Sequence, residues 1–101
     1  MIIYSVTISI EADIRAEWLD WMQQHHIPAV MSTGYFLENH IQELIDPEPQ
    51  EGTYTFNIQY GCESMEDYET YMQNEAKVMQ ELHTSRFSDK FVAFRTLLRR
   101  F

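Results

Sequence analysis

The order of hydrophobic patterns is the feature that most constrains how this 101-residue chain can fold. Segments with a two-residue repeat, typical of strands, are separated by segments with the three-to-four-residue repeat of helices. The predicted order is strand, helix, strand, strand, helix, strand. This βαββαβ order predicts an α+β fold on the ferredoxin-like plan, with two helices on one face of a four-stranded antiparallel sheet. The other face of that sheet is left without helices.

The predicted strands cover residues 2–10, 35–45, 53–60 and 91–99. In the first, every even position from Ile2 to Ile10 is apolar, whereas Ser5, Thr7 and Ser9 are polar. The even positions are therefore expected to lie under the helices. The third strand alternates as cleanly. The second alternates imperfectly, so its register stays open, and a shift by one residue would move every side chain to the other face.

Two amphipathic segments separate these strands. The apolar face of the first comprises Ile14, Trp18, Met22 and His25. This spacing predicts a helix that is capped by Asp13 and ends at about residues 25–26. Pro28 lacks an N–H group, so it is expected to break this helix and open a short further turn. The second helix is expected to start after Ser64, a capping residue, and to continue past Leu82.

The charge balance limits the partners that this chain can bind. Sixteen acidic and seven basic residues give a net charge of −9. Nucleic acids and anionic membranes are bound through Lys and Arg, so neither is expected as a partner. No segment approaches the roughly 20 consecutive apolar residues of a membrane-spanning helix. With 45% hydrophobic residues the chain has material for a core, and we expect one domain over residues 1–101.

Cysteine use and the N-terminal sequence favour a cytoplasmic location. Cys62 is the only cysteine, so no intramolecular disulfide can form, which fits a reducing compartment. The first residues lack the basic region of a signal peptide, and polar residues interrupt the apolar run from Ser5 onward. A reactive role for Cys62 is not expected, because no motif surrounds it.

The uncovered sheet face is the first candidate for a functional surface. Its centre is expected to carry small polar or amide side chains: Ser5, Thr7, Ser9, Thr55, Asn57 and Gln59. The residues that would join them if the strand registers match are His40, Gln42 and Arg95. Such a face suits either a solvated surface or a polar cavity between two facing sheets. We favour the cavity, because Ile3, Phe91 and Leu97 are expected there as well and are poorly suited to water.

Several segments of the sequence together resemble a bacterial family of domains of unknown function. The segments are Trp18–Met22, His26–Phe36, Arg86–Phe87 and Phe91–Thr96. The similarity extends over nearly the whole chain. It implies a ferredoxin-like fold of the dimeric α/β-barrel type, in which two sheets face each other, so we expect a homodimer. The family has no established activity, so the resemblance assigns no catalytic residue and implies no cofactor.

His25 and His26 are candidate functional residues near the predicted end of the first helix. Either imidazole could cap free carbonyls and interact with the helix dipole. His25 continues the apolar face, so we expect it to be half-buried. His26 belongs to a segment that resembles the family, and it could bind a ligand or remove a proton from a phenol or enol. A metal site is not expected, because adjacent helical side chains diverge and no further ligand lies at a suitable spacing.

Arg95 is the other candidate. An arginine within an apolar strand needs an anionic partner. That partner could be a carboxylate of the same chain such as Glu38, a carboxylate of a facing subunit, or the carboxylate of a ligand. In a polar cavity the further ligand-binding candidates are His40, Asn57 and Gln59.

These observations lead to two functional hypotheses. The first is a small homodimeric binding or structural module, with a polar cavity between facing sheets that takes a small molecule. The alternative is a cofactor-independent monooxygenase or isomerase that acts on a small aromatic or enolisable molecule, as some proteins of similar fold do. No phosphate-binding loop, activated nucleophile or nucleotide-cofactor motif is present. The sequence alone does not decide whether the protein is an enzyme.

Overall fold

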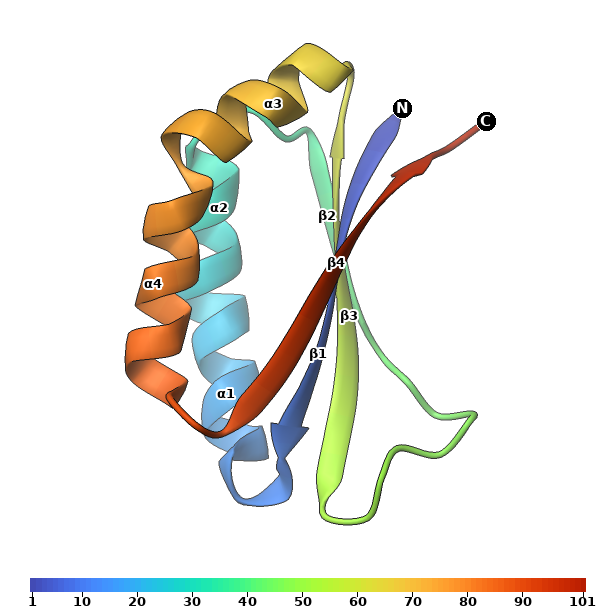
Figure 1. Cartoon of the computed structure of the whole chain (residues 1–101), viewed down its shortest axis with the longest axis vertical. Coiled ribbons are helices and arrows are strands. Elements are labelled where there is room, and N and C mark those ends of the chain that lie inside the picture. Colours follow the sequence, from blue (N-terminus) through green and yellow to red (C-terminus); the bar gives the residue numbers. More distant parts are fainter.

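Helices cover one face of a four-stranded antiparallel sheet in the computed structural model, which describes residues 1–101 (Figure 1). The strands are β1 (Ile2–Glu11), β2 (Glu38–Glu43), β3 (Thr53–Cys62) and β4 (Phe91–Arg99). Their order across the sheet is β2-β3-β1-β4, so the longest pairings join the first strand to the third and the fourth. The predicted α+β ferredoxin-like fold is confirmed.

The first helical segment runs through Pro28 without the predicted break. It consists of a 3₁₀ turn (Ala12–Ile14), α1 (Arg15–Trp21), a π-helical turn (Met22–His26) and α2 (Ile27–Ser32). His26 and Ile27 keep right-handed helical backbone angles. Pro28 cannot donate to the carbonyl four residues before it, and in a regular α-helix its ring would collide with that carbonyl. The wider π turn directly before Pro28 gives that carbonyl room.

The π turn also decides which histidine faces the sheet. Met22 and Ile27 are both buried, although they are five residues apart. Five residues of a regular α-helix correspond to a rotation of about 500°, which would point the two side chains in different directions. The extra residue of the π turn returns them to one face. His25 is therefore exposed and His26 is half-buried, so the prediction that His25 continues the apolar face is wrong.

The second helical segment is divided, whereas the sequence predicts one helix. It consists of α3 (Met65–Asn74) and α4 (Ala76–Phe87), which meet at an angle at Glu75 (Figure 1). The bend lets Tyr71 and Ala76, again five residues apart, both be buried. The predicted cap is confirmed, because the backbone N–H of Asp67 donates to the Ser64 hydroxyl at 3.2 Å. None of the helices has the length and apolar character needed to span a lipid bilayer.

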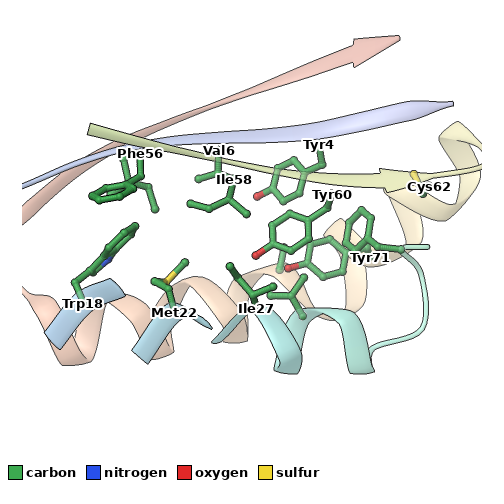
Figure 2. Packing of buried hydrophobic residues seen from close by; sticks show 14 of the residues in the cluster. Tyr4, Val6, Trp18, Met22, Ile27, Phe56, Ile58, Tyr60, Cys62 and Tyr71 are labelled. Carbon is green, nitrogen blue, oxygen red and sulfur yellow. The ribbon is translucent and has the colours of Figure 1, made fainter. Parts of the chain in front are cut away.

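The hydrophobic core lies between the helices and the sheet. Trp18 packs against Phe56, with ring centres 4.9 Å apart, at one end of this layer. Three tyrosines occupy the middle and the other end (Figure 2). Figure 2 shows the hydroxyl groups of Tyr4, Tyr60 and Tyr71 on the side that faces Ile58 and Met22. The core therefore contains a group of phenols that point in a common direction.

We expect the Ser64→Ala variant to lose about 1 kcal/mol of free energy of unfolding, because the first turn of α3 would lose its side-chain cap. Urea denaturation at fixed protein concentration measures this loss. The control is Ser88→Ala, an exposed serine that follows α4 and whose side chain makes no hydrogen bond. Equal losses in the two variants would show that the cap contributes nothing.

Candidate functional site

The polar side chains of the uncovered sheet face are bonded largely to one another. The Asn57 amide donates to Ser5 Oγ at 2.9 Å and to Thr7 Oγ1 at 3.1 Å. Gln42 donates to Asn57 Oδ1 at 2.7 Å, and the Ser9 and Thr55 hydroxyls lie 2.7 Å apart. This network satisfies the central groups without a ligand.

The strand registers show which of the other predicted residues lie on the uncovered face. His40 pairs with Gln59, and Gln42 pairs with Asn57, so both residues of β2 lie on the uncovered face. The apolar residues here are Val92, Phe94 and Leu98, with exposed fractions of 72%, 62% and 45%. Phe91 and Leu97 were predicted on this face and lie on the opposite one, because the register of β4 differs by one residue from the expected one.

Arg95 does not join Asn57 and Gln59. It pairs with Val6, so its side chain lies on the helical side of the sheet, where it is exposed on the edge strand, and the predicted placement is wrong. Arg95 Nε donates to Tyr4 Oη at 3.1 Å. None of the chain's five ion pairs includes Arg95, and Glu38 is paired with Arg100 instead. The guanidinium is therefore without a carboxylate partner.

A cavity of about 40 Å³ lies between the helices and the sheet, next to Arg95. Its polar lining residues are Tyr4, His26, Tyr60, Tyr71, Gln80, His83 and Arg95. The remaining lining residues are apolar and include Val6, Met22 and Ile58. No Asp or Glu lines it, although the whole chain carries a net charge of −9. Arg95 is thus the one formal charge at this cavity.

The tyrosines provide hydrogen-bond donors to the cavity. Burial raises the pKa of Tyr4, Tyr60 and Tyr71, so all three phenols stay protonated at neutral pH. The Tyr60 and Tyr71 hydroxyls make no hydrogen bond to another side chain or to the backbone. Yet Arg15 Nε is the only side-chain nitrogen or oxygen that is fully buried and lacks a hydrogen-bond partner. Both hydroxyls must therefore reach the cavity or solvent.

His26 lies beside this cavity, and His25 does not line it. Its ring stacks on Trp21, with ring centres 4.8 Å apart and planes inclined by 22°. Burial lowers the pKa of His26 to about 4, so the imidazole is neutral at pH 7. Because the helix continues past both histidines, neither caps a helix end, and that alternative is wrong.

His83 is a second imidazole at the cavity, and the sequence analysis did not identify it. It lies on α4 with an exposed fraction of 6%, and its ring centre is 5.9 Å from that of His26. Trp18 Nε1 donates to His83 Nε2 at 2.9 Å. Burial, followed by the nearby His26 and Arg95, lowers the pKa of His83 to about 4. Residues four positions apart lie on the same face of a helix, so the spacing between His83 and Phe87 was the one sequence feature that could have indicated a buried His83.

The arrangement can therefore hold a small oxyanion and exchange a proton with it. Arg95 supplies positive charge, the phenols supply donors, and the neutral imidazole of His26, which makes no hydrogen bond within the chain, can accept a proton. No group of three or more His, Cys, Asp or Glu side chains lies close enough together to hold a metal ion.

Comparison with known proteins places the chain in a family. The model of a domain of unknown function, DUF4286, matches residues 1–101. The chain belongs to this family. No sequence match is found among curated proteins. The predicted membership of an uncharacterised family is confirmed.

Solved structures with the same fold have very different sequences. An ethyl tert-butyl ether D family protein from Bacillus halodurans has a TM-score of 0.71 at 10% identity, and the match covers 100% of both chains. A proposed antibiotic biosynthesis monooxygenase from Deinococcus radiodurans has a TM-score of 0.65 at 15% identity, covering 100% of this chain and 93% of that one. A dimeric ferredoxin-like protein from an uncultured marine organism has a TM-score of 0.64 at 11% identity, covering 100% and 98%. At these identities the likeness establishes the fold alone.

We expect the protein to lose stability as the pH falls from 6.5 to 4. In this window an unfolded histidine binds a proton, whereas His26 and His83 in the folded chain stay neutral until about pH 4. The unfolded state therefore binds more protons, and the free energy of unfolding falls by about 2 to 3 kcal/mol per histidine. Urea denaturation across this pH range measures the loss. The double variant His26→Gln/His83→Gln should show a shallower decline, and a decline equal to that of the parent protein would contradict the assignment.

Proposed function

We propose that the protein binds a small anionic molecule, with a carboxylate or enolate group, in the cavity between its helices and its sheet. The observation that carries this proposal is Arg95, a cation without a carboxylate partner at a cavity that no Asp or Glu lines. An arginine binds a planar oxyanion through parallel hydrogen bonds. The protonated phenols of Tyr60 and Tyr71 add donors of the kind that an anion needs.

The size of the cavity supports a ligand of few atoms. One water needs about 10 to 15 Å³, so the 40 Å³ space corresponds to about three water molecules. A cavity that admits a benzene ring measures about 150 Å³. Size therefore favours a small carboxylate, or the acidic end of a longer molecule, over an aromatic ring.

The uncovered sheet face supports a homodimer. Val92, Phe94 and Leu98 form an exposed apolar strip along β4, beside a polar network whose hydrogen bonds are already made. Two such faces can pack against each other without leaving polar groups unpaired. A protein of the same fold from a marine organism is dimeric. The lone cysteine and the acidic charge support a cytoplasmic location without a nucleic-acid or membrane partner.

Acetate is the smallest probe of the anion site, and acetamide is its neutral counterpart. We expect acetate, and not acetamide, to shift the NMR signals of cavity residues in a saturable way. Arg95→Gln should weaken acetate binding at least tenfold, because the site would lose its only cation. Arg99→Gln is the matched control, since it removes an equal charge from the same face of β4 outside the cavity. Equal weakening of acetate binding in both variants would show that Arg95 acts only through the net charge of the protein.

We expect Phe94→Glu to convert the dimer to a monomer, because it would bring two like charges together at the centre of the apolar strip. Light scattering at micromolar concentration measures the mass. The control is Val78→Glu on α4, which places a carboxylate at a valine that is 54% exposed on the helical side. A parent protein that is monomeric at this concentration would overturn the facing-sheet dimer.

A second candidate function is a cofactor-independent isomerase or monooxygenase that removes a proton from an enolisable acid. The neutral His26 imidazole favours it, because a neutral imidazole can act as a base and Arg95 could stabilise the enolate. The test is exchange of the methyl protons of pyruvate in D₂O, followed by proton NMR. His26→Gln should abolish any acceleration while acetate binding persists. Exchange at the rate of a protein-free control would reject this candidate and leave the binding function untouched.

A further inference from the structure

We propose that Trp18 fixes His83 in the tautomer that carries its proton on Nδ1, so that His83 is a hydrogen-bond donor to the oxyanion in the cavity and not its base. This inference rests on the proposed anion site and names the part of the ligand that His83 contacts. Trp18 is then a positioning residue, because it acts on the ligand through His83.

The hydrogen bond between the two side chains determines the tautomer. The indole Nε1–H of Trp18 can only donate, and it lies 2.9 Å from His83 Nε2. His83 Nε2 must therefore be the ring nitrogen without a proton. A neutral imidazole carries one proton, which leaves it on Nδ1. Trp18 is fully buried, so water cannot replace His83 as its acceptor without opening the core.

The donor that results is free to meet a ligand. His83 Nδ1 makes no hydrogen bond within the chain. It is not fully buried either, because Arg15 Nε is the only fully buried side-chain nitrogen or oxygen that lacks a hydrogen-bond partner. The Nδ1–H group must therefore reach the cavity that His83 lines, or solvent. A permanent N–H donor beside a guanidinium suits an oxyanion, since both groups stabilise negative charge.

The same tautomer separates the roles of the two imidazoles. The lone pair of His83 is occupied by Trp18, so this ring has no free site at which to accept a proton from a ligand. His26 has no hydrogen-bonded partner on either ring nitrogen, and its contact with Trp21 is through the ring faces. Of the two, only His26 retains a lone pair for the ligand. This difference cannot be read from the pKa values, which are lowered to about 4 in both residues.

The tautomer is measured in the free protein, without any ligand. Two-bond proton–nitrogen correlation spectra of ¹⁵N-histidine-labelled protein at pH 7.5 distinguish protonated from unprotonated ring nitrogens. The chain has four histidines, and the signals absent from His83→Gln assign those of His83. We expect protonated Nδ1 and unprotonated Nε2. A proton on Nε2 would overturn the inference, and this measurement needs no variant with a perturbed core.

The consequence for binding is measured by acetate titration of two variants. Trp18→Phe leaves an aromatic ring but no N–H group, so the Nε2–H tautomer of His83 should appear and acetate should bind about tenfold more weakly, as for one hydrogen bond to a charged group. His83→Gln can accept from Trp18 through its carbonyl and donate through its amide, so it should bind acetate within about threefold of the parent. Melting temperatures establish that each variant is folded at the titration temperature.

The outcomes separate this inference from the proposed function. If acetate does not bind to the parent protein while His83 shows the expected tautomer, the anion site fails, and the role of His83 as its donor fails with it. If acetate binds and Arg95→Gln weakens it, but Trp18→Phe binds as tightly as the parent, the anion site stands and the inference about Trp18 and His83 is overturned.

Discussion

Both helical segments must cover the same face of the four-stranded sheet, and the rest of the structure depends on how they meet this constraint. In each segment two buried residues lie five positions apart: Met22 and Ile27 in the first, Tyr71 and Ala76 in the second. A straight α-helix cannot bury both members of such a pair on one flat face. The first segment inserts a π turn and the second bends at Glu75. His26, in the π turn, and His83, on α4 after the bend, line the same cavity.

The cavity itself follows from the choice of tyrosine in the core. Tyr4, Tyr60 and Tyr71 are long and rigid, and each carries a hydroxyl group that loses free energy if it is buried without a partner. Their hydroxyls face a common side in Figure 2, so the apolar parts of the rings pack together while the polar ends line a shared space. Phenylalanines at these positions would lack the hydroxyl groups that line this space. Tyr4 is further held by the Arg95 Nε–H group, which connects the core to the edge strand.

The sequence predicts the fold well because clean alternation in β1 and β3 identifies both central strands and their buried faces. It also predicts the Ser64 cap, which depends on local chemistry alone. The prediction from sequence fails where a shift of one residue changes which face of a strand or helix a side chain occupies. The sequence predicts a register of β4 that is one residue off, which places Arg95 beside Asn57, whereas the structure places it beside Tyr4. A regular helical period places His25 on the buried face, whereas the π turn leaves His25 exposed and His26 half-buried. The sequence does not indicate a role for His83, because its partner, Trp18, lies 65 residues away in the sequence.

The alternation of β4 connects the two proposed surfaces. Phe94 faces the uncovered side of the sheet, and its neighbour Arg95 faces the cavity. β4 is an edge strand, and such strands are held by hydrogen bonds on one side only. Packing of Phe94 against a second copy would restrict the motion of this strand and thereby fix the position of the guanidinium. In a monomer the same strand would have an exposed apolar face and a free edge. The anion site and the dimer are therefore expected to stabilise each other, although no residue of the polar network on the uncovered face contacts the cavity.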